Sequence, residues 1–123
     1  MTPSFEQLQV LAQREIDRVL PRLPQHIRDA TQQLAIQLED YPDSESGLDD
    51  DLLGVFLGNS LANLDGCYPS PEPTEIILFL GNIWDYVEGD EDAFIEEVRI
   101  TLLHELGHFL GLDEIDLDER GLG

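Results

Sequence analysis

HELGHFLGLDE, residues 104–114, lies near the C-terminus and determines how the rest of the sequence is interpreted. An α-helix turns by about 100° per residue, so side chains four positions apart lie on one face. His104 and His108 can therefore direct two imidazole rings at one ion, which is half of a zinc site. Glu105 lies off that face but within reach of a water on the metal, whose proton it could accept.

The residues that follow His108 supply candidates for a third metal ligand. Gly111 allows the chain to leave the helix in a left-handed conformation and to turn back toward the ion. Asp113, Glu114 and Asp116 come next, and each has a carboxylate that can bind zinc. The spacing alone leaves the choice among these three acids open.

The composition indicates one soluble domain with an unusual charge. A chain of 123 residues is long enough for a single domain with one hydrophobic core. Its 27 acidic residues face only six basic ones, all arginine, and the formal net charge is −21. Such a surface repels nucleic-acid phosphates and anionic membranes, so we expect neither of them as a partner.

Two further features predict the cellular location. No segment reaches the roughly 20 apolar residues that a membrane-spanning helix requires. Residues 1–13 lack the basic start and compact apolar core of a signal peptide. Cys67 is the only cysteine, so the chain forms no internal disulfide, and we expect a reducing cytoplasm.

The N-terminal segment has the pattern of an amphipathic helix. Apolar residues recur every three or four positions over residues 5–20, with polar residues between them. Ser4 is the predicted N-cap, and Pro21 is expected to end the helix. The third histidine, His26, follows, and we expect it to be exposed in a polar turn and not to bind metal.

Three apolar runs are typical of β-strands, namely residues 34–38, 52–57 and 75–80. The acidic stretch between the first two predicts a surface loop. Gly54 interrupts the second run, which indicates a bulge or a close approach of the backbone to a neighbour. The third run is unbroken, which predicts burial on both faces or partial cover by another element.

The remaining segments are predicted to be helical. Residues 83–87 suggest a short helix, and a long final helix is expected to begin at Asp90 or Asp92 and to carry an apolar stripe as far as Phe109. The order helix, strands, helix predicts an α+β fold, in which the two long helices cover one side of a small sheet.

Taken together, these motifs resemble the mini-zincins, a family of small bacterial zincin-like metallopeptidases. The likeness covers nearly the whole chain and rests on Leu23-Pro24, Glu39-Asp40-Tyr41-Pro42, Leu52-Leu53-Gly54 and the apolar run 75–80. Its most specific part is EEVRITLLHELGH, residues 96–108.

The resemblance implies a minimal zincin-like fold over residues 1–123, with a small mixed sheet of three or four strands packed against an N-terminal helix and a C-terminal active-site helix. It implies zinc ligation by His104 and His108 and a general-base role for Glu105. The family's third-ligand position, normally an aspartate, falls on Glu114, which is longer by one methylene group. Because of this departure, Asp113 and Asp116 remain alternatives.

The leading functional hypothesis is a zinc-dependent metallopeptidase that acts on peptides or unfolded proteins. Two histidines and one carboxylate leave a coordination position for water, and Glu105 would accept its proton. The alternative is a zinc-binding scaffold or regulatory interaction module without efficient turnover, because a chain of 123 residues has little length for a deep cleft.

The same reasoning yields an expectation about the substrate. A peptide is expected to pair with an edge strand of the sheet, and the apolar run 75–80 is the first candidate for that strand. A net charge of −21 attracts cationic peptides. We therefore expect a preference for Lys- or Arg-rich segments that weakens as salt concentration rises.

Overall fold

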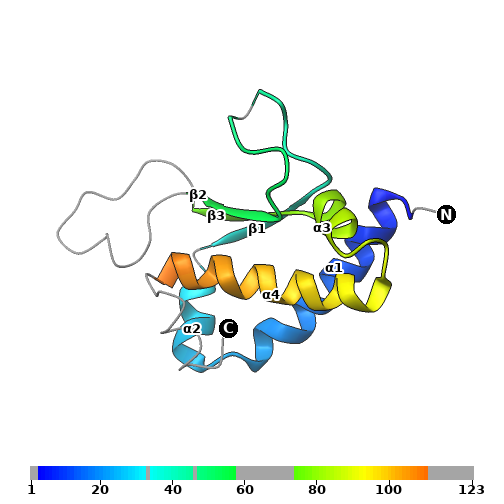
Figure 1. The fold of residues 1–123 in the computed structure, drawn as a ribbon. Helices are drawn as coiled ribbons and strands as arrows, with labels where there is room; N and C mark the ends of the chain where they lie inside the picture. The colour runs from blue at the N-terminus through cyan, green and yellow to red at the C-terminus, as the bar shows by residue number, and fades with distance from the viewer. Residues whose placement is uncertain (1–2, 33, 46, 58–73, 111–123) are drawn as a thin grey trace.

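The computed structural model describes residues 3–32, 34–45, 47–57 and 74–110 (Figure 1). These form, in chain order, α1 (Phe5–Val19), the short 3-10 helix η1 (Leu20–Arg22), α2 (Gln25–Thr31), β1 (Ala35–Glu39), β2 (Gly54–Leu57), β3 (Glu75–Phe79), α3 (Leu80–Tyr86) and α4 (Glu91–Leu110). The expected α+β class is therefore confirmed.

Helix α1 begins at a capping box. The hydroxyl of Ser4 accepts a hydrogen bond from the backbone N–H of Gln7 at 3.2 Å, and Gln7 Oε1 accepts one from the backbone N–H of Ser4 at 2.9 Å. These bonds satisfy amide groups that a helix N-terminus leaves without partners. Pro21 lies in the 3-10 turn that follows, so both predicted ends of the helix are confirmed.

Helix α2 is an element that the sequence pattern does not predict. His26 lies in its first turn and is exposed, so the expected exposure is confirmed but the polar turn is wrong. Ile27 is the only buried residue of this helix. Seven residues with one buried side chain give too short an apolar pattern for a helical period to be recognised.

The sheet has three strands in the order β1-β3-β2, so β3 is central. β1 runs parallel to β3 from the pair Ala35 and Glu75, and β2 runs antiparallel to it from the pair Gly54 and Leu78. Both edges of β3 are therefore occupied by neighbouring strands. The prediction that a peptide pairs with residues 75–80 is wrong, because an unbroken apolar run marks a central strand and a central strand has no free edge.

The hydrophobic core lies on one face of this sheet. Helix α4 lies against the strands, and α1 packs against α4 on the same side of the sheet (Figure 1). Ile76 and Leu78 of β3 are fully buried, and the ring of Phe56 on β2 contacts that of Phe109 on α4 with centroids 5.9 Å apart. The predicted arrangement of two long helices on one side is therefore confirmed.

The opposite face of the sheet is only partly covered. Ile77, whose side chain points away from the helices, is half-buried and lines a cavity of about 250 Å³ together with Tyr41 and Leu48 of the loop between β1 and β2. The apolar run 75–80 is compatible with burial on both faces or with partial cover by another element, and the structure shows partial cover.

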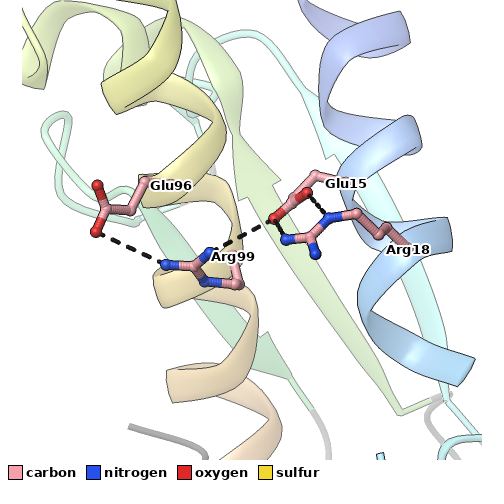
Figure 2. Close-up of polar contacts among 4 residues, drawn as sticks. All are labelled: Glu15, Arg18, Glu96 and Arg99. Carbon is pink, nitrogen blue, oxygen red and sulfur yellow. Dashed lines mark hydrogen bonds and ion pairs between the residues drawn. The ribbon is translucent and has the colours of Figure 1, made fainter. Parts of the chain in front are cut away.

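A small ion-pair network joins α1 to α4 (Figure 2). Arg18 donates to both carboxylate oxygens of Glu15, from Nε at 2.7 Å and from Nη2 at 2.6 Å. Arg99 of α4 lies 3.9 Å from the same carboxylate and 3.7 Å from that of Glu96. The side chain of Glu15 is only 5% exposed, whereas that of Glu96 is 62% exposed. The hydrogen bond from Arg18 lowers the pKa of Glu15, although burial opposes this shift.

Replacing the buried carboxylate should destabilise the fold in a pH-dependent way. Glu15→Gln should lower the free energy of unfolding by about 1–2 kcal/mol at neutral pH, because a neutral amide loses the charge-assisted bonds to Arg18. The pKa of Glu15 is lower in the folded chain than in the unfolded chain, so its contribution is complete above the unfolded pKa and is lost as pH falls through the folded pKa. Denaturant unfolding followed by circular dichroism at about pH 7 and about pH 3 measures both effects.

Glu96→Gln is the matched control, because it makes the same change at the exposed end of the same network. It should cost no more than about 0.5 kcal/mol at neutral pH. Equal stabilities of the two variants at pH 7, or a cost of Glu15→Gln that grows toward acid, would contradict the assignment.

Candidate active site

Helix α4 carries the histidine motif, and its packing fixes where each side chain points. The helix begins at Asp90, whose Oδ1 accepts a hydrogen bond from the backbone N–H of Ala93 at 3.1 Å, so the first of the two predicted caps is the one used. Its buried apolar stripe consists of Phe94, Val98, Leu102, Leu106 and Phe109. Because this stripe faces the core, the helix cannot rotate without exposing it.

The two histidines of the motif face each other. Their Nε2 atoms are 3.2 Å apart, and the rings of His104 and His108 are nearly perpendicular, at 87°. Zinc–nitrogen bonds of 2.0–2.1 Å in a tetrahedral site place two ligand atoms roughly 3.3 Å apart. The observed separation therefore fits two ligands of one zinc ion. Without metal, the same geometry allows a hydrogen bond between the rings when one Nε2 carries the proton.

Glu105 lies between the histidines and the core. Its side chain is buried, with 8% of the residue exposed. Burial raises the pKa of this carboxyl, and the charges of the nearby imidazoles, His108 and then His104, oppose the shift. A carboxylate with a raised pKa is a stronger base than one in water, which is the property that a proton acceptor requires.

A cavity of about 390 Å³ opens beside these residues, between α4 and the start of β2. Its lining is Leu52, Leu53 and Gly54 from the β2 side and Glu97, Ile100, Thr101, His104 and Glu105 from α4. The strand and the helix can approach closely here because position 54 is glycine. A Cβ atom at Gly54 would lie 2.7 Å from Cγ2 of Thr101 and 3.2 Å from the carbonyl oxygen of Ile77. The expected close approach at Gly54 is therefore confirmed.

The predicted third ligands fall outside the described residues. This applies to Glu114 and to its alternatives Asp113 and Asp116, and also to Cys67. Within the part of the chain that the structure describes, no group of three or more His, Cys, Asp or Glu side chains is arranged to hold a metal. The described site thus brings the imidazole rings of His104 and His108 together, and their role as metal ligands stays a prediction.

Sequence reasoning missed part of the cavity wall. Glu97 and Thr101 lie seven and three positions before His104, so with His104 and His108 they form one stripe along the helix. This spacing is visible in the sequence. The stripe can be recognised as a cavity wall only when β2 is known to lie opposite it, because the same spacing also occurs on ordinary solvated helix faces.

A helix that carries facing histidines and a buried glutamate in the order HExxH, and that packs against a small mixed sheet, is typical of the zincin class. Residues 31–123 match the family described as zincin-like metallopeptidase, and the chain belongs to this family. A comparison with curated proteins gives no match. Among the described residues, no helix is both long enough and apolar enough to cross a membrane.

The contact between β2 and α4 can be tested by a double-mutant cycle. Gly54→Ala should destabilise the fold by about 1–3 kcal/mol, because the added methyl group overlaps Cγ2 of Thr101. Thr101→Ser removes that methyl group, so Gly54→Ala should cost less in the Thr101→Ser background. Denaturant unfolding of the four proteins gives the coupling energy. Additive costs would show that the two positions do not constrain each other.

Proposed function

We propose that this protein is a zinc-dependent peptidase that hydrolyses bonds in peptides or unfolded proteins. The observation that carries the proposal is the pair of imidazole nitrogens 3.2 Å apart, one helical turn from each other, with the buried Glu105 beside them. Membership of the zincin-like metallopeptidase family supports the same conclusion.

The ligand set in this proposal is His104, His108 and Glu114. Two imidazoles and one carboxylate are a common catalytic set, and they leave a fourth position free. Glu114 is supported by its distance of three residues from Gly111 and by the family pattern. When bound, zinc would supply the Lewis acidity that makes a water molecule acidic near neutral pH.

Glu105 moves the proton in this scheme. Its carboxylate accepts a proton from the attacking water while the water oxygen forms a bond to the scissile carbonyl carbon. The carboxyl then donates that proton to the nitrogen of the leaving amine as the carbon–nitrogen bond breaks. Burial raises the pKa of Glu105, so the group holds the proton more readily between the two transfers.

Strand β2 is the strand that we now propose for peptide binding. Among the described residues β2 pairs only with β3, and its other edge is the one to which we propose that a peptide is added. It lies against α4 at Thr101, one turn before Glu105. An extended peptide added to this edge would pass the cavity and bring a backbone carbonyl to the catalytic residues.

Metal content provides the first test of the proposed ligands. The purified protein should bind close to one zinc ion, and His104→Ala, His108→Ala and Glu114→Ala should each weaken binding by more than about 100-fold, since each removes a direct ligand. Competition with a chromophoric chelator measures the affinity. His26→Ala is the control, because His26 is exposed on α2 and should not change it.

Two results would count against this ligand set. If His104→Ala and His108→Ala both bound zinc as tightly as the wild type, the proposed metal site would be ruled out. Full affinity in Glu114→Ala, together with loss in Asp113→Ala or Asp116→Ala, would transfer the third-ligand role to that aspartate.

The role of Glu105 provides the second test. Glu105→Gln should keep zinc but lower kcat by about 100-fold or more, because it removes the proton acceptor without removing a ligand. Cleavage of a peptide library by the zinc-loaded protein, analysed by mass spectrometry, measures this loss. Glu96→Gln, an exposed change on the same helix, should leave the rate unchanged.

The same experiment separates the peptidase from its main alternative. A protein that binds zinc tightly but cleaves no library peptide, either as wild type or as Glu105→Gln, would be a zinc-binding interaction module. Cleavage that survives Glu105→Gln at the wild-type rate would show that another group accepts the proton.

A further inference from the structure

A second acidic residue, Glu97, lines the cavity beside Glu105, and the proposed chemistry does not use it. Glu97 lies seven residues before His104 on the same helix face. With a rise of 1.5 Å per residue, this places it about 10 Å along the helix from the first proposed ligand. The cavity therefore has catalytic residues at one end and a separate negative charge toward the other.

The carboxylate of Glu97 has no cation opposite it in the described part of the chain. Glu97 is half-buried, and its Oε1 accepts a hydrogen bond from the hydroxyl of Thr101 at 3.3 Å. Arg99, the arginine of α4, pairs instead with Glu15 and Glu96. A half-buried carboxylate with one long, neutral hydrogen bond retains most of its capacity to accept bonds from a cation.

The other walls of the cavity are largely apolar. Leu52 and Leu53 lie on the β2 side and Ile100 lies on α4, so apolar surface leads to the carboxylate. Lys and Arg side chains match this arrangement, because each has an aliphatic stem and a cationic head. An apolar side chain of the same length would bury the carboxylate of Glu97 without giving it a hydrogen-bond partner, and an acidic side chain would be repelled.

We propose that this cavity is a specificity pocket for a Lys or Arg side chain of the peptide, and that Glu97 recognises its cation. The proposal rests on the peptidase function proposed above. An extended peptide advances about 3.3 Å per residue, so 10 Å along α4 corresponds to roughly three residues. The selected basic residue therefore lies within about three positions of the scissile bond.

This local recognition differs from the attraction exerted by the net charge of −21. Long-range attraction favours a basic residue anywhere in the peptide and is screened when salt shortens the Debye length. The pocket favours a basic residue at one position. A direct ion pair at a half-buried carboxylate is also less sensitive to salt.

The test uses the zinc-loaded protein and peptides that carry one Lys, Met or Glu at each position around the cleaved bond. The wild type should prefer Lys at one position by about five- to tenfold in kcat/KM, as a partly buried ion pair provides. Glu97→Gln should abolish that preference, and Glu97→Arg should favour Glu there. Glu96→Gln and Glu96→Arg make the same charge changes one residue away, on an exposed side chain, and should keep the preference for Lys.

Two results would overturn the proposal: a preference for Lys that Glu97→Gln leaves intact, or one that Glu96→Gln reduces equally. Zinc content and far-ultraviolet circular dichroism identify any variant that fails to fold, and Glu97→Gln, which preserves shape, remains informative if Glu97→Arg does not fold.

Peptide-binding measurements distinguish failure of the proposed peptidase function from failure of the proposed pocket. If the wild type cleaves none of the peptides, their affinities for the zinc-loaded protein are measured by fluorescence anisotropy. A preference for Lys that is lost in Glu97→Gln and kept in Glu96→Gln would support the pocket without turnover, and any other result would overturn it.

Discussion

Leu102, Leu106 and Phe109 bury one face of α4 against the sheet and α1, and this packing fixes the rotation of the helix about its axis. The histidine side chains then lie away from the core, with facing nitrogens. Glu105 falls at the boundary, where burial raises its pKa. The chemistry proposed for this protein therefore depends on hydrophobic contacts made by residues that take no part in it.

The second constraint is the position of β2. Only a glycine at position 54 allows the strand to lie against Thr101, and the same approach closes one wall of the cavity. Metal ligands within one helical turn are set by the sequence of that turn. A binding cleft, in contrast, requires two segments far apart in the chain, here residues 52–54 and 97–105.

This difference explains what the sequence could predict. The buried apolar stripe of α4 and the cap of α1 depend on residues close together in the sequence, and both are confirmed. The facing of the two histidine rings depends on one helical turn and is also observed, whereas zinc binding by them stays a prediction. The order of the strands depends on tertiary pairing, which the sequence pattern does not encode, so the prediction of an edge strand at residues 75–80 is wrong and this strand is central. Helix α2 was missed because it buries one side chain. The role that we propose for Glu97 depends on the cavity between α4 and β2, which the sequence alone does not reveal. The third ligand remains a prediction.

The outer edge of β2, which we propose for peptide binding, also affects how the protein behaves at high concentration. A strand edge that can pair with a peptide can also pair with the same edge of another copy, which is a common route to aggregation. The formal net charge of −21 opposes such self-association, because two chains of like charge repel each other. This protection depends on pH and disappears near the isoelectric point of about 4.1, so colloidal stability is lowest there. The acidic surface thus opposes the pairing of β2 edges between two copies of the chain.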